Sequence, residues 1–249
     1  MKKLLFIPVI CLILVSCSQS IYYQMYQTKP MTENIKINEN ALIYEDDNCI
    51  ILYDFWKEKG DIGFVIYNKN MENLLIHLDE CFYVENGFAY DYYKNRINNC
   101  SLITGSTAEI EKKTICIPPQ YSKKISEFNI TEQLYKDCDL PSYPGKKENN
   151  TLRFTEEDSP MVFGNIIAYS IGNSDTIYRI NNVFYVSKIS NFSIDQITIE
   201  IPKEECGKKT PYNKERVFKS SGPDQFYIQY NYDYRYDNNP NNPMYYERC

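Results

Sequence analysis

Short runs of β-branched and aromatic residues, each closed by a turn, constrain the fold of this chain more than any other feature. Two of them, 41–44 and 49–56, flank the acidic turn Glu45-Asp46-Asp47-Asn48. Successive runs are spaced by about eight to fourteen residues, which suits a sandwich or barrel and leaves no room for βαβ crossovers. The 24 tyrosines and 12 phenylalanines favour pleated surfaces, and only four alanines are present to support helices. We therefore predict an all-β, antiparallel fold with long loops.

The same pattern continues to the end of the chain. Residues 90–99 are expected to form a short helix or an aromatic loop, 131–135 one helical turn, and 202–222 a long polar loop. Further strands are predicted at 62–67, 74–79, 81–85, 114–117, 124–130, 151–154, 162–171, 176–180, 183–189, 196–201 and 225–236.

The N-terminal segment has the pattern of an export signal. Lys2 and Lys3 precede an apolar run from Leu4 to Val15, which is too short to span a bilayer, since a spanning helix needs about 20 residues. The run ends in Leu14-Val15-Ser16-Cys17, which resembles a bacterial lipobox. The resemblance implies cleavage before Cys17 and attachment of a diacylglycerol to its thiol. Two or more acyl chains give stable anchoring, because each buried CH₂ contributes roughly 0.8 kcal/mol.

The residues after Cys17 refine this expected location. Ser18, rather than Asp, follows the cysteine, and by resemblance to the lipoprotein sorting rule this favours the outer membrane. Residues 18–31 contain no acidic side chain, so we expect the periplasmic face. The predicted organisation is a signal peptide at 1–16, a lipidated cysteine and polar tether at 17–39, and a sandwich domain at 40–249 with residues 90–150 as a candidate insertion.

Charge and histidine content exclude several classes of function. The formal net charge is −6 and the isoelectric point is about 5.0, which argues against nucleic-acid binding. His77 is the single histidine, which nearly excludes histidine-based triads and multi-histidine zinc sites. Strand alternation places His77 and Asp79 on one face, where they could form an oriented base. Their commoner role is an exposed polar pair, and we predict no catalytic residue, metal or cofactor.

Acidic clusters and cysteines add no catalytic signature. Asp46/Asp47, Glu156/Glu157/Asp158 and Asp233/Asp237 are interpreted as turn and edge acids rather than paired catalytic carboxylates. Of nine cysteines, seven remain after Cys11 is removed and Cys17 is lipidated, so at most three intrachain disulfides can form. Cys81 and Cys116 lie in apolar runs and are expected to be buried thiols.

The last predicted strand carries an aromatic ladder. Phe226, Ile228 and Tyr230 alternate with polar residues, and the series continues through Tyr232, Tyr234 and Tyr236. We expect its first half to be buried as the core face of a strand. The residues from Tyr232 to Tyr236 precede an Asn-Pro-rich tail and are candidates for stacking against sugar rings or a partner.

Several spaced motifs resemble a group of Bacteroidetes lipoproteins of unknown function. They are YDFW, GFVIYNK, LLIHLDECFYVENG, TICIPPQYSKKISEF, SPMVFGNIIAYSIG and INNVFYVSKISNF, within residues 50–193. The resemblance implies an immunoglobulin-like or related β-sandwich and transfers no catalytic residue. We therefore expect a lipid-anchored, non-enzymatic binding or assembly module at the outer membrane, with envelope proteins or glycans as partners. The alternative is a carbohydrate-binding accessory protein that uses exposed tyrosines.

Overall fold

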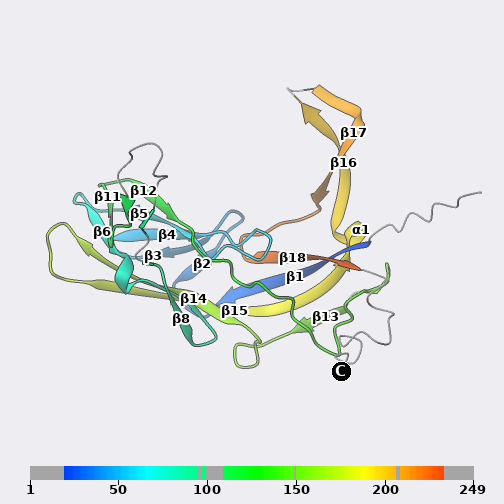
Figure 1. Cartoon of the computed structure of the whole chain (residues 1–249), viewed down its shortest axis with the longest axis horizontal. Helices are drawn as coiled ribbons and strands as arrows, with labels where there is room; N and C mark the ends of the chain where they lie inside the picture. Colours follow the sequence, from blue (N-terminus) through cyan, green and yellow to red (C-terminus); the bar gives the residue numbers. More distant parts are fainter. Residues whose placement is uncertain (1–19, 95–96, 99–108, 149, 206–207, 233–249) are drawn as a thin grey trace, which may run out of the picture.

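The computed structural model describes residues 20–94, 97–98, 109–148, 150–205 and 208–232 (Figure 1). Within these ranges the regular elements are almost all strands, and neighbouring strands run antiparallel, which confirms the predicted all-β antiparallel fold. Two sheets curl over one another in a sandwich-like half-barrel. The described helical elements are the 3₁₀ turn η1 (Leu78–Glu80) and α1 (Ile194–Ile197).

A nine-stranded sheet forms the larger layer. Its main path runs in the order β11-β6-β14-β15-β1-β18, and β13, β7 and β8 join it at the sides. The bounds are β1 Ser20–Pro30, β6 Leu74–His77, β7 Phe82–Glu85, β8 Phe88–Asp91, β11 Thr114–Ile117, β13 Asn150–Arg153, β14 Val162–Ile171, β15 Tyr178–Ser193 and β18 Gln225–Tyr232. The ranges 176–180 and 183–189, predicted as two strands, belong to the single 16-residue strand β15.

A five-stranded sheet forms the smaller layer, in the order β12-β5-β4-β3-β2. Its bounds are β2 Ile35–Ile37, β3 Leu42–Glu45, β4 Cys49–Tyr53, β5 Phe64–Asn68 and β12 Ser122–Ile125. The acidic turn predicted between 41–44 and 49–56 joins β3 to β4, where the Asp46 carboxylate accepts hydrogen bonds from the backbone N–H groups of Asn48 and Cys49, each at 2.8 Å. A separate short ladder pairs β9 (Ile97–Asn98) with β10 (Glu109–Ile110).

Aromatic rings from both layers meet in the core. Phe184 of β15 lies 5.2 Å from Tyr53 of β4 and 5.0 Å from Phe55, measured between ring centroids. All three side chains are completely buried. Close approach of two strands also requires a glycine here, because a Cβ at Gly164 of β14 would lie 2.2 Å from the carbonyl oxygen of Asn182.

The predicted polar tether is wrong from Ser20 onward. Residues 20–30 form β1, which lies inside the large sheet between β15 and β18. The segment is polar in sequence, yet it forms an inner strand because its buried polar side chains are hydrogen-bonded. The amide of Gln24 donates to Asn191 Oδ1 at 2.9 Å, and the hydroxyl of Thr28 donates to the carbonyl oxygen of Asp224 at 2.9 Å. Residues 1–19, including the predicted signal peptide and Cys17, lie outside the described ranges.

The predicted long loop at 202–222 is also wrong. Most of it belongs to a hairpin of β16 (Thr198–Glu205) and β17 (Lys208–Phe218), which pair only with each other and project from the body (Figure 1). We call this hairpin the arm. Its charges pair across the strands: Glu200 lies 3.2 Å from Arg216 and 3.6 Å from Lys214. Cross-strand ion pairs make a regular strand pair look like a polar loop in sequence.

Residues 90–150 supply edge strands to both layers, β11 to the large sheet and β12 to the small one. Strand β8 extends to Asp91, so the helix or loop predicted from residue 90 is wrong at its start. No helical turn forms at 131–135, because the Thr131 hydroxyl closes a local turn by accepting a hydrogen bond from the Gln133 N–H at 3.3 Å. The Gln24 side chain then holds the next segment through the Tyr135 N–H at 2.8 Å.

Candidate functional site

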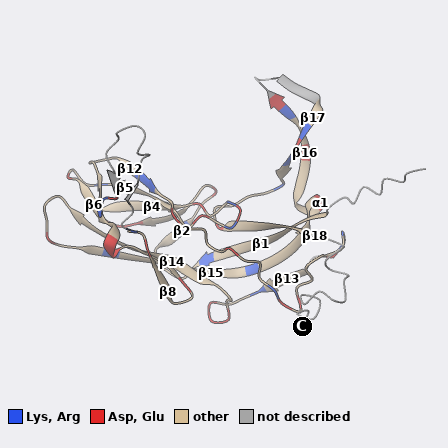
Figure 2. Ribbon diagram, viewed as in Figure 1, with Lys and Arg blue, Asp and Glu red and all other residues tan. Residues whose placement is uncertain are grey.

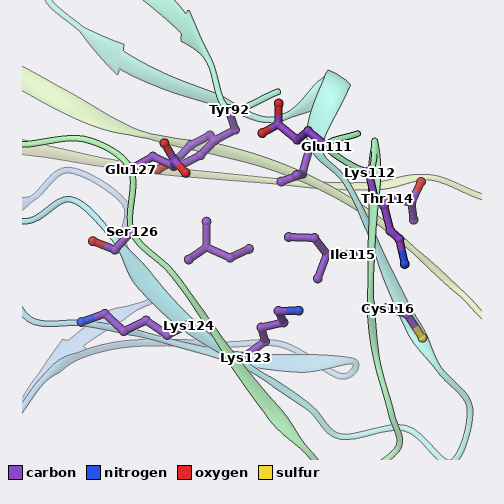
Figure 3. A pocket seen from close by; sticks show the side chains of 12 residues that line it. Tyr92, Glu111, Lys112, Thr114, Ile115, Cys116, Lys123, Lys124, Ser126 and Glu127 are labelled. Carbon is purple, nitrogen blue, oxygen red and sulfur yellow. The ribbon is translucent and has the colours of Figure 1, made fainter. Parts of the chain in front are cut away.

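An open groove lies where the edge strands of the two sheets come together. Strand β11 ends the large sheet, β12 ends the small sheet, and both line the groove (Figure 3). Residues 118–121 connect the two strands directly. The volume of the groove is about 770 Å³, which is within the range of ligand sites in proteins. The free edge of each strand leaves backbone N–H and C=O groups without a sheet partner.

The inner part of the groove is apolar and rigidly held. Leu78, Tyr92 and Ile125 are buried, and Ile115 of β11 is partly buried beside them. The Tyr92 hydroxyl is fixed by a 2.7 Å hydrogen bond to Oδ1 of Asn165, a completely buried residue. Burial raises the pKa of Tyr92 well above its ordinary value, so its hydroxyl stays protonated. The floor can therefore accept apolar groups without rearranging.

Basic side chains line the outer part. Lys123 and Lys124 come from β12 and Lys112 precedes β11, and all three are exposed (Figure 3). Basic residues on β12 are also visible in Figure 2. Within the described ranges, the side chains of these three lysines make no hydrogen bond or ion pair. Edge lysines commonly protect a strand against aggregation, but three free cations around one groove also create a positive potential that attracts anions.

The two carboxylates at the groove are already engaged. Glu111 accepts a hydrogen bond from the backbone N–H of Lys94 at 3.1 Å, and Glu127 lies 3.8 Å from the Lys94 ammonium group. The same ammonium lies 4.4 Å from the ring centre of Phe128. Both carboxylates therefore have partners of their own, and the groove is lined by three lysines against these two acids.

A hydroxyl and a carboxylate are hydrogen-bonded to each other at the edge of the groove. The Ser126 hydroxyl donates to the Asp61 carboxylate at 2.8 Å. Across the described ranges, no group of three or more His, Cys, Asp and Glu side chains is placed to hold a metal ion.

His77 and Asp79, the pair considered as an oriented base, interact with other groups. His77 Nε2 lies 3.0 Å from the Ser170 hydroxyl, while Asp79 lies in η1 and pairs with Lys113 at 3.3 Å. The 3₁₀ turn breaks the strand alternation after His77, which is why the two side chains separate. The structure therefore shows neither the oriented base nor the exposed polar pair, because the two side chains have different partners and His77 is only partly exposed.

The aromatic ladder is buried along its first half, as predicted. Phe226 and Ile228 are buried, and Phe226 stacks on Tyr26 with ring centroids 4.5 Å apart. Tyr230 is partly buried and stacks on Tyr22 at 5.8 Å. Strand β18 ends at Tyr232. The side chain of Tyr232, together with Tyr234 and Tyr236, lies outside the described part, so their role as stacking residues stays a prediction.

The described cysteines differ from one another in exposure. Cys49 and Cys81 are free and buried, and burial raises the pKa of the Cys81 thiol to about 11. Cys138 is disulfide-bonded. Cys116 is free but exposed, so its predicted burial is wrong: the apolar run around it forms edge strand β11, which lacks a neighbour on one side. Cys17, the predicted lipidation site, lies outside the described residues.

Sequence reasoning missed the groove, although two signals for it are present. Lysine is unfavourable in strand interiors, so Lys124 at the start of the strand predicted at 124–130, directly after Lys123, indicates an edge. Pro118-Pro119 marks the sharp passage between the two layers. Neither signal shows that the edges of two different sheets meet, because that depends on pairings distant in the sequence.

Comparisons with protein-family models, curated proteins and solved structures find no match for this chain. Among the described residues, no helix has the length and apolar character needed to cross a membrane.

Proposed function

We propose that this chain is a lipid-anchored, non-enzymatic binding module of the bacterial outer membrane, and that its groove takes an extended acidic segment of a partner protein. The observation that carries the proposal is the set of three free lysines around an apolar floor, between two free strand edges. The lipobox-like sequence ending in Cys17 supports the anchor.

The groove chemistry suits this class of ligand. An extended segment adds to a free strand edge through main-chain hydrogen bonds, and its alternate side chains then point in opposite directions. Apolar side chains on one face would contact Leu78 and Ile115, while carboxylates on the other would pair with Lys123 or Lys124. Such charge pairing governs association rate and partner choice more than affinity.

Site-specific photo-crosslinking in intact cells tests the proposal. A benzoyl-phenylalanine at Thr114, which lines the groove, should crosslink to one envelope protein through an acidic segment. The same probe at Glu157, an exposed residue in the turn between β13 and β14, should give no such product. Digestion and mass spectrometry of the product identify the captured segment.

Charge reversal provides the matched control. Lys123→Glu with Lys124→Glu should remove the Thr114 crosslink, whereas Lys29→Glu with Lys57→Glu makes the same charge change on exposed lysines outside the groove and should leave it intact. Equal crosslinking by both double variants would contradict the acidic-segment proposal. A protease-resistant glycan product would instead favour the carbohydrate-binding alternative.

A further inference from the structure

The base of the arm lies at the same end of the molecule as Ser20, the first described residue. Ser20, the first residue of β1, has Tyr232 as its Cα partner, and Tyr22 has Ser193. Ser193 directly precedes α1, which leads into β16 (Figure 1). Only three peptide steps separate Ser20 from Cys17, a span of at most about 10 Å. A lipid on Cys17 would therefore hold this end of the molecule, including the base of the arm, next to the bilayer.

One face of the arm is directed at the body. Phe218 at the end of β17 lies 5.0 Å from Trp56 and 4.7 Å from Tyr227, measured between ring centroids. Arg216 lies on the same face, two residues away, and its guanidinium is 3.3 Å from Oδ1 of Asp195 and 3.2 Å from Oε1 of Glu200. The polar and aromatic face of the hairpin is thus already occupied.

The opposite face is aliphatic and points away from the body. Ile199 and Val217 are Cα partners on this face, and Ile201 follows by strand alternation, with the exposed Glu215 as its Cα partner and the one charged residue among these four. Ile199 is 47% exposed, Ile201 and Val217 are partly exposed, and none of the three belongs to the buried core of the described residues. A hairpin surrounded by water would place polar residues here, and an isolated two-stranded hairpin is only marginally stable. The three aliphatic side chains therefore leave apolar surface that no described segment covers completely.

Pro202 in β16 lacks the backbone N–H that edge pairing needs, which disfavours a second copy adding as a neighbouring strand. We propose that the arm lies on the bilayer, with Ile199, Ile201 and Val217 buried in the boundary between headgroups and acyl chains. The inference rests on the proposed lipid anchor at Cys17. The arm would then fix the orientation of the molecule on the membrane, with the body extending from it.

Quenching by brominated lipids tests this contact in the full-length lipidated protein. Vesicles of phosphatidylethanolamine and phosphatidylglycerol carry the brominated acyl chains, and Trp56→Phe removes the single native tryptophan. Ile199→Trp reports from the aliphatic face, with Val217→Trp as a second reporter. Met71→Trp is the control, because Met71 is 84% exposed and lies in the β5–β6 turn, whose next residues contact Gly172 at the opposite end of the large sheet.

Brominated lipid should lower the emission of both arm reporters about twofold or more and leave the Met71→Trp emission unchanged. Vesicle flotation measures separately whether the protein is anchored to the membrane. Protein that floats but shows equal emission from Ile199→Trp and Met71→Trp would overturn the arm contact while leaving the anchor intact. Protein that fails to float would remove the anchor and the inference together. Arm-to-arm crosslinks between copies, without quenching, would identify a second copy as the occupant and also overturn the proposal.

Discussion

Two asparagines in the core show how single residues set this structure. Asn182 is completely buried, and its amide donates to the Tyr53 hydroxyl at 2.9 Å. Asn165, equally buried, donates to the carbonyl oxygen of Ile62 at 2.9 Å. Buried amides are costly unless bonded, so each fixes the relative position of the two segments it connects. Oδ1 of Asn182 has no partner among the described residues. The hydrogen bond to Tyr53 is therefore the contact that holds this side chain.

Removing that hydroxyl should measurably destabilise the protein. Tyr53→Phe leaves the Asn182 amide buried without its acceptor, and we expect a loss of about 1–3 kcal/mol in the free energy of unfolding. Urea denaturation followed by fluorescence measures the change. Tyr121→Phe removes the hydroxyl of a 67% exposed tyrosine and should change stability by less than about 0.5 kcal/mol. Equal effects of the two substitutions would argue against the buried contact.

At the scale of elements, the strand spacing and turn residues predicted much of the fold. Val162–Ile171 was predicted with its observed bounds, and the acidic turn between β3 and β4 is confirmed. Patterns fail where polar residues are buried or charges pair across strands. Gln24 and Thr28 made β1 resemble a tether, and Glu200 with Arg216 made the arm resemble a loop. Both errors concern contacts between residues distant in the sequence.

The candidate site was less predictable than the fold for the same reason. Burial of Phe226 and Ile228 follows from alternation and was predicted. The groove instead depends on the meeting of β11 and β12, each an edge of a different sheet. A sequence pattern indicates that a strand is an edge, but it does not indicate which other edge lies across from it.

The close approach of β14 to β15 at Gly164 predicts that a larger residue there destabilises the protein. Gly164→Ala would place a methyl group 2.2 Å from the Asn182 carbonyl oxygen, so the two central strands must separate. We expect a loss of at least about 1–3 kcal/mol in the free energy of unfolding. Gly145→Ala is the matched control, since the nearest atom to its Cβ is 3.6 Å away. Thermal denaturation of both variants distinguishes this steric effect from a general cost of replacing glycine.

At the scale of the whole molecule, buried tyrosines predict unfolding at high pH. Burial raises the pKa of several hydroxyls above the ordinary value of 10, namely those of Tyr26, Tyr53, Tyr83, Tyr92, Tyr169 and Tyr230. Above pH 10 the unfolded chain therefore binds fewer protons than the folded chain, and stability falls as pH rises. A fully buried group such as Tyr53 contributes up to about 1.4 kcal/mol per pH unit.

Tyrosinate absorbance at 295 nm measured against pH tests this expectation. The buried hydroxyls should ionise together with loss of the near-ultraviolet circular dichroism signal, above pH 10, while exposed tyrosines ionise earlier. A gradual titration of all tyrosines near pH 10, with the fold intact, would show that these hydroxyls are accessible to solvent.

The anchor is the claim on which the membrane location and the arm contact both depend. The most direct measurement is the mass of the mature N-terminal peptide from membrane-purified protein, compared with a Cys17→Ser variant. We predict a chain that begins at Cys17 and carries acyl chains, and a variant that leaves the membrane fraction. An unmodified Cys17, or a mature chain beginning elsewhere and recovered in the soluble fraction, would contradict the account.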